Sequence, residues 1–119
     1  MIAIAAIAAH SALASSHYVR VAPSSVMRGR VVRVYGSVGS GCGSAQVTIF
    51  SRAFRGATTH EFAGVPAIYT RQDSTHRFSF HVRIRSAVAR RRYDVGGRCG
   101  GGNFGSTTLT VISGLPQGY

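Results

Sequence analysis

The chain has very little negative charge. Its 119 residues include only three carboxylates and no lysine, so all 14 basic residues are arginine and the formal net charge is +11. Scarce carboxylates leave few groups for acid–base catalysis. The positive surplus attracts polyanions and anionic surfaces, and the planar guanidinium fork fits carboxylate and phosphate. The alternative is that the arginine content reflects a GC-rich coding genome and has no function.

No apolar run reaches the roughly 20 residues that a membrane-spanning helix needs. The most apolar stretch, Ile2–Ala9, fits instead the core of an export signal, and Ala12-Leu13-Ala14 fits the small-residue cleavage pattern. We therefore expect a signal peptide over residues 1–14 and one exported domain over residues 15–119. No positive charge precedes Ile2, which leaves open a start further upstream and a truncated signal. The alternative is an ordinary apolar strand or helix.

Only two cysteines are present, Cys42 and Cys99, and neither belongs to a C-x-x-C pair. This spacing argues against a zinc site, whereas two cysteines in an exported chain favour a single disulfide. Closing so long a loop would stabilise the fold by about 4 kcal/mol in the chain-entropy model.

Short apolar runs separated by glycine predict an all-β domain. Strands are expected at residues 17–21, 30–35, 45–50, 76–85, 93–99 and 106–113. The segment 54–69 is less regular, and Pro66 restricts any strand there to an edge or an interruption. In 76–85, Phe78, Phe80, Val82 and Ile84 alternate with polar residues, which is typical of one buried and one solvated face. About seven strands at this spacing predict a two-sheet sandwich.

The stretch 93–105 joins an alternating strand to a glycine run. Tyr93, Val95, Gly97 and Cys99 are two residues apart and are expected on the inner face. The run 100–105 formally matches G-x-G-x-x-G, but a strand follows it where a dinucleotide-binding fingerprint needs a helix. We therefore interpret the glycines as a tight connection and expect no cofactor.

Three motifs give the chain a resemblance to a known group. They are Val32-x-Val34-x-Gly36-Ser37 leading to Gly41-Cys42, Glu61-Phe62-Ala63-Gly64-Val65-Pro66-Ala67, and Tyr93-x-Val95 followed by Gly97-Arg98-Cys99-Gly100-Gly101-Gly102-Asn103-Phe104-Gly105. On these motifs the chain resembles the small secreted immunoglobulin-like proteins of actinobacteria over residues 19–111. The resemblance implies export and an immunoglobulin-like Greek-key sandwich, but no particular activity.

The chain departs from the group and from antibody domains at definite positions. Arg91-Arg92 stands where the group tends to carry a Gly-Thr pair before the tyrosine. Tryptophan is absent, and Tyr93 precedes Cys99 by six residues rather than the two of antibody-type domains. An immunoglobulin-like sandwich is therefore implied, and a true immunoglobulin domain is not.

No residue pattern predicts an enzyme or a metal site. His60 and Glu61 are adjacent, so a strand would point them to opposite faces. The serines lack a G-x-S-x-G elbow, and His76 and His81 are five residues apart, which separates them across a strand. We expect no catalytic, cofactor or metal-binding residues.

The arginines provide the one specific candidate site. In a sandwich of this type the strands at 17–21, 30–35 and 76–85 share a sheet, whose outer face would carry arginines, with more at its rim. The candidate polyanion contacts are Arg33, Arg77, Arg83, Arg85, Arg90, Arg91 and Arg92. Such a patch would suit phosphate or sulfate polyanions. The alternative is a solvated surface without a partner, because Tyr18 and Tyr35 are the only evident stacking aromatics on this face.

Together these features lead to an expected function. We expect a non-catalytic domain, secreted or associated with the cell envelope, that acts as a binding or structural module; its unidentified partner would be an extracellular protein or an anionic envelope polymer. The alternative is a cationic polyanion-binding protein that uses an arginine-rich sheet face.

Overall fold

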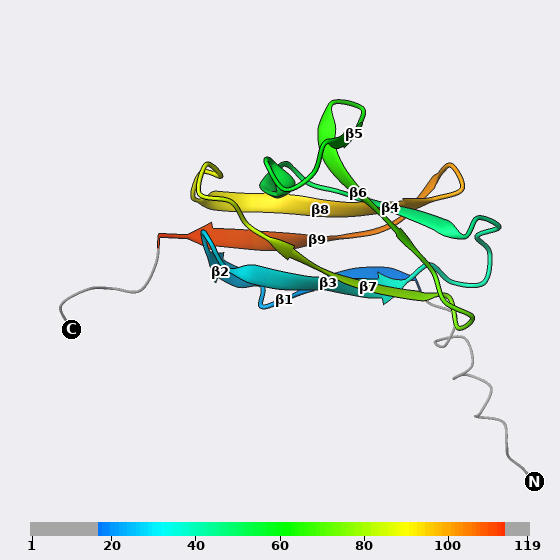
Figure 1. The fold of residues 1–119 in the computed structure, drawn as a ribbon. Helices are drawn as coiled ribbons and strands as arrows, with labels where there is room; N and C mark the ends of the chain where they lie inside the picture. Colours follow the sequence, from blue (N-terminus) through cyan, green and yellow to red (C-terminus); the bar gives the residue numbers. More distant parts are fainter. Residues whose placement is uncertain (1–16, 114–119) are drawn as a thin grey trace, which may run out of the picture.

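The computed structural model describes residues 17–113, and the expected signal peptide lies outside them. Within this range the chain forms two packed β-sheets and no α-helix (Figure 1). One sheet has the strand order β1-β3-β7 and the other β2-β9-β8-β4-β6-β5. The predicted all-β fold of two packed sheets is confirmed.

The three-stranded sheet is antiparallel and consists of β1 (Tyr18–Ala22), β3 (Val31–Ser37) and β7 (Arg77–Arg83). The six-stranded sheet consists of β2 (Ser25–Met27), β4 (Gln46–Phe50), β5 (His60–Phe62), β6 (Val65–Arg71), β8 (Arg91–Cys99) and β9 (Gly102–Ile112), with a 3-10 turn, η1 (Arg52–Phe54), after β4. The pairing of β2 with β9 is parallel and all other pairings are antiparallel. Sequence reasoning missed β2 and β5, the three-residue strands at the two edges of this sheet.

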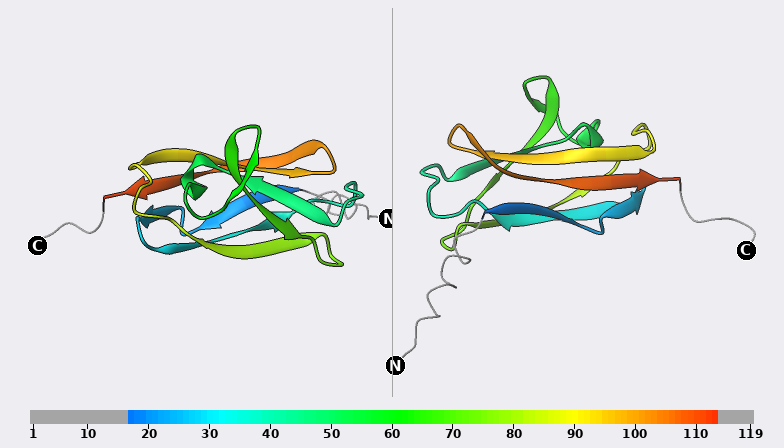
Figure 2. Two further views of the ribbon diagram at one scale, coloured as in Figure 1. Left: turned by 45° about the horizontal axis from the view of Figure 1, so that its top comes forward. Right: turned by 180° about the vertical axis from the view of Figure 1, so that it is seen from behind.

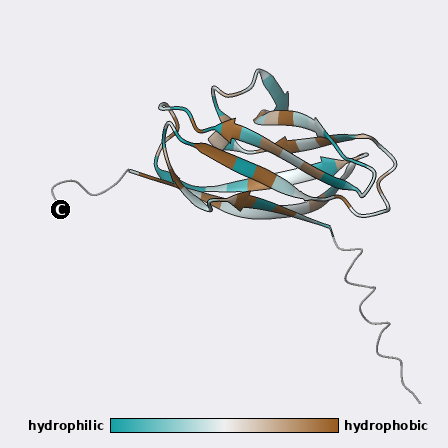
Figure 3. Ribbon diagram, turned by 60° about the horizontal axis from the view of Figure 1, so that its bottom comes forward, coloured by the Kyte–Doolittle hydropathy of each residue, from teal (hydrophilic) through white to brown (hydrophobic). Residues whose placement is uncertain are grey.

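The core lies between the sheets and follows the predicted alternation. Val47, Ile49, Val95 and Leu109 are fully buried, and hydrophobic and hydrophilic residues alternate along the strands in Figure 3. Each buried aliphatic side chain contributes roughly 1.5–3 kcal/mol before the entropy cost of ordering it.

In β7 the predicted inner face is confirmed, with one looser position. Phe78 and Val82 are buried, as is Ile84 just beyond the end of the strand, whereas Phe80 is half-buried and meets the Phe54 ring edge-on at a centroid distance of 6.5 Å.

The predicted Cys42–Cys99 disulfide is confirmed. It joins the β3–β4 loop to the end of β8, with Cα atoms 5.9 Å apart and a sequence separation of 57. Because β3 and β8 belong to different sheets, the bond fixes the loop that crosses from one sheet to the other.

The loop that joins β8 to β9 is shorter than expected and contains only two glycines of the run after Cys99. Only Gly100 and Gly101 have positive φ, 68° and 117°, which glycine adopts without strain. The strand β9 begins at Gly102, four residues before the expected start, because Gly102 pairs with Cys99. This extension sends the Phe104 ring inward over Gly97, whose missing Cβ makes room for it.

The irregular segment 54–69 contains a hairpin that stands out from the six-stranded sheet (Figure 2). Its β5–β6 turn uses Ala63 and Gly64, both at positive φ, as a tight hairpin requires. The strand with Pro66 was expected at an edge or interrupted; β6 is not an edge strand, since it lies between β4 and β5, but its pairing with β4 ends at Ala67, so that ladder does not continue to Pro66. Pro66 accepts a hydrogen bond from the Ser51 N–H, just beyond the end of β4, so its backbone nitrogen interrupts no ladder bond there.

Candidate polyanion interface

The outer face of the three-stranded sheet is rich in arginine, as predicted. Strand pairing places Arg20 opposite Tyr35, and Arg33 opposite His81. Alternation along the strands sends these side chains to solvent while their neighbours enter the core. We call the exposed set Arg20, Arg33, Arg77 and Arg83 the arginine face.

Two tyrosines hold two of these guanidinium groups against the sheet. The Arg20 Cζ lies 4.7 Å from the ring centroid of Tyr18, and the Arg33 Cζ lies 4.3 Å from that of Tyr35. The Nε of Arg33 also donates to the Ser79 Oγ at 2.9 Å. Stacking of this kind restrains the long side chain, so less rotamer entropy is lost when its terminal N–H groups bind an anion.

A hollow of about 500 Å³ lies on this face, lined by Tyr18, Tyr35, Arg33, Arg77, Arg71 and Asp73 among others. Asp73 Oδ1 accepts hydrogen bonds from the hydroxyl and the backbone N–H of Thr75 and from the backbone N–H of Arg77. These bonds, above all that from the Thr75 hydroxyl, hold the pKa of Asp73 below its ordinary value of 3.8. The carboxylate therefore organises its own turn, and three arginines outnumber it in the hollow.

The seven candidate contacts do not form one continuous face with a rim. Three of them, Arg33, Arg77 and Arg83, lie on the arginine face, whereas Arg85 and Arg90 lie in the β7–β8 loop. The remaining two, Arg91 and Arg92, were expected before the strand but belong to β8 in the other sheet.

The β7–β8 loop adds charge at one end of the sandwich. Arg83 Nη1 donates to the Gly29 carbonyl at 2.6 Å, and the Gly29 N–H donates to the Ile84 carbonyl at 2.6 Å. These bonds place the loop beside the β2–β3 turn, where Arg28 and Arg30 are also exposed. Arginines from two segments distant in sequence thus gather at this end.

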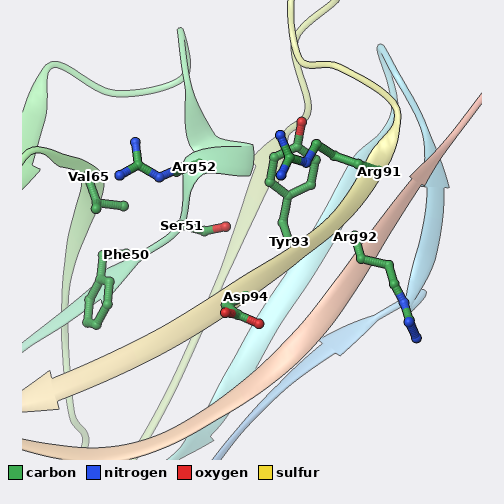
Figure 4. A pocket seen from close by; sticks show the side chains of 8 residues that line it. All are labelled: Phe50, Ser51, Arg52, Val65, Arg91, Arg92, Tyr93 and Asp94. Atoms are coloured by element: carbon green, nitrogen blue, oxygen red, sulfur yellow. The ribbon is translucent and has the colours of Figure 1, made fainter.

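A pocket of about 370 Å³ lies on the six-stranded sheet, between the end of β4, η1, β6 and the start of β8 (Figure 4). We call it the β8 pocket; its charged lining residues are Arg52, Arg91, Arg92 and Asp94. Arg91 stacks on Tyr93 with its Cζ 5.6 Å from the ring centroid, and the Tyr93 hydroxyl donates to the Ala89 carbonyl at 2.6 Å. Sequence reasoning marked Arg91 and Arg92 but missed Arg52 and Asp94, which only the folded chain brings to them.

The possible metal ligands among the described residues are dispersed. No group of three or more His, Cys, Asp or Glu side chains lies together within residues 17–113 in a way that could hold a metal ion. The exposed His60 stacks on Tyr69 with ring centroids 4.6 Å apart. The described part of the chain also contains no helix long and apolar enough to cross a membrane.

Comparison with known proteins shows a likeness of fold alone. No protein-family model and no curated protein matches this sequence. A solved structure of the Pseudomonas fluorescens alkylpurine DNA glycosylase AlkC, bound to DNA containing an abasic site analog, is similar with a TM-score of 0.59 and 10% identity. The match covers 83% of this chain and 31% of the glycosylase chain, so this protein spans about a third of that length.

A second similar chain comes from a structure that concerns T cell specificity and activation by the bacterial superantigen toxic shock syndrome toxin-1. It has a TM-score of 0.44 and 14% identity, with 82% of this chain and 100% of that chain covered. At this TM-score the likeness carries no inference.

Proposed function

We propose that this protein is a non-catalytic, exported binding module of immunoglobulin-like Greek-key topology that binds an anionic polymer outside the cell or on its envelope. The Cys42–Cys99 disulfide supports export, because such bonds persist in oxidising compartments. Kinship with the secreted immunoglobulin-like proteins of actinobacteria is part of this proposal.

The arginine face is the observation that carries the proposal. Its guanidinium groups project from one sheet, and tyrosine stacking restrains those of Arg20 and Arg33. The nearest carboxylate that lines the same hollow, Asp73, is already engaged by Thr75 and Arg77. An array of guanidinium groups that outnumber the carboxylate beside them attracts polyanions through long-range charge and direct contacts. The second candidate ligand, an extracellular protein, has no comparable feature in its favour.

Salt-dependent binding of the exported chain to duplex DNA and to dextran sulfate tests the proposal. DNA is a suitable probe because affinity falls with a slope of about 0.9 per phosphate contact on a log–log plot against salt. If the four residues of the arginine face each contact a phosphate, the slope is about −3.6. The same ligands can be immobilised on a column and the protein eluted with a salt gradient. Elution at ~0.15 M salt would refute the proposal, because attraction that weak is no more than non-specific.

A matched pair of double variants separates the face from net charge. Arg33→Gln with Arg77→Gln should reduce the slope by about 1.8, because two phosphate contacts are lost. The double variant Arg52→Gln with Arg91→Gln removes the same charge from the β8 pocket, and the slope of its DNA affinity against salt should stay close to that of the wild type. Equal losses in the two variants would mean that the arginine face has no special role.

A further inference from the structure

The β8 pocket is held in shape before any ligand arrives. The Ser51 N–H donates to the Pro66 carbonyl at 3.0 Å, and the Ser51 Oγ accepts from the Ala53 N–H at 3.1 Å. Ser51 is 1% exposed, so these bonds are shielded from water and fix the backbone at Arg52. A pre-formed site loses little conformational entropy on binding, and its volume of about 370 Å³ is in the range of small-ligand pockets.

One wall of the pocket is apolar and equally fixed. The Phe50 ring lies over Gly96, where a Cβ would come within 2.7 Å of the ring. Phe62 packs against this ring with the two centroids 5.2 Å apart, and the Arg98 Cζ lies 4.8 Å from the Phe62 ring centroid. Phe50 and Val65 therefore offer the pocket an immobile surface suited to the C–H face of a sugar ring.

The charged groups of the pocket include the carboxylate of Asp94, as those of the hollow on the arginine face include Asp73. Arg52 and Arg91 flank the pocket, and Arg92 points away from both (Figure 4). Guanidinium groups bind a carboxylate or a phosphate, and an ionised aspartate accepts hydrogen bonds but donates none. Asp94 would repel any anion, a doubly charged phosphate monoester more strongly than a singly charged carboxylate, whereas it would accept a hydrogen bond from a neutral hydroxyl.

We propose that the β8 pocket binds one carboxylated sugar unit of an anionic polysaccharide, with the carboxylate on Arg52 and Arg91, a hydroxyl on Asp94 and the ring against Phe50. This assignment rests on the proposed function and names its ligand class. A uronic acid combines these features: one negative charge, several hydroxyl donors and an apolar ring face. The arginine face then supplies general attraction to the polymer, and the pocket selects the carboxylated sugar.

Binding of a galacturonate oligomer by calorimetry tests the assignment, because general attraction and specific recognition predict opposite effects for one substitution. Asp94→Ala removes a negative charge, so attraction alone would raise affinity for any polyanion. Loss of a charge-assisted hydrogen bond to the sugar instead lowers affinity for the oligomer about tenfold. Glu61→Ala is the matched control, since Glu61 is an exposed carboxylate that does not line the pocket.

The expected result is a loss of oligomer affinity in Asp94→Ala, none in Glu61→Ala, and an unchanged or higher affinity of Asp94→Ala for dextran sulfate. The double variant Arg52→Gln with Arg91→Gln should also lower the affinity for the oligomer. The double variant Arg33→Gln with Arg77→Gln should lower it less. Equal gains in the two carboxylate variants would overturn the pocket assignment. If the wild-type protein binds dextran sulfate but not the oligomer, the pocket assignment is overturned and the proposed function stands. If the wild-type protein binds neither ligand, the pocket assignment and the proposed function are both overturned.

Discussion

Removing the Cys42–Cys99 disulfide should cost the domain a large part of its stability. The bond closes a loop with a sequence separation of 57. In the chain-entropy model such a loop restricts the unfolded chain by about 4 kcal/mol at 25 °C. A domain of this size typically has only about 5–15 kcal/mol in total, and 4 kcal/mol corresponds to a fall in Tm of roughly 15–30 °C.

The double variant Cys42→Ser with Cys99→Ser isolates this effect. Both sulfur atoms lie 3.5 Å from the Ser44 carbonyl, so at each position a serine hydroxyl has an acceptor in reach and leaves no buried polar group unpaired. The measured loss should therefore reflect the missing cross-link and not a new defect in packing.

Chemical denaturation followed by circular dichroism, on the oxidised wild type and on the variant, measures the difference. Wild-type protein treated with reductant should reproduce the variant and serves as the control. A difference below about 1 kcal/mol would refute the reasoning, because it would mean that the unfolded chain is not appreciably restricted by the loop.

Two further predictions concern single residues. Gly97→Ala should lower the free energy of unfolding by about 1–3 kcal/mol, because its Cβ would overlap the Phe104 ring. The control Gly102→Ala, which has nothing within 4 Å of the added atom, should change this free energy by less than about 0.5 kcal/mol. Equal effects of the two substitutions would contradict the packing argument. Because the folded-state pKa of Asp73 is lowered, its contribution to stability is present above the ordinary value of 3.8 and is lost as the pH falls through the folded pKa. Thermal unfolding of Asp73→Asn should accordingly depend less on pH below 3.8 than that of the wild type, and equally steep profiles would exclude this role.

The periodicity of the chain was sufficient to predict two packed sheets and, in the longer strands, which residues face inward. Phe78 and Val82 alternate with Arg77 and Arg83 in one strand, and a strand of period two must separate them to opposite faces. The arginine face follows from this local rule, since each strand contributes its own outward residues. The disulfide could be predicted for a different reason, namely that two cysteines allow only one pairing.

The boundaries that tertiary pairing decides were predicted less well. The edge strands β2 and β5 have three residues each and exist because a longer neighbour offers them a partner. The early start of β9 depends on its pairing with β8, including a register shift at Gly97 and Arg98. Neither feature has a periodic signal of its own, because so short a segment contains no full repeat of a pattern.

Only the tertiary structure created the β8 pocket. Its walls come from Phe50 and Arg52, from Val65, and from Arg91 and Asp94, segments that meet because β4 pairs with both β6 and β8. The sequence by itself determined that arginines would lie outside and that carboxylates would be few, since composition and alternation are local properties. Which carboxylate stands beside which guanidinium is a property of non-local strand pairing, and no local pattern records it.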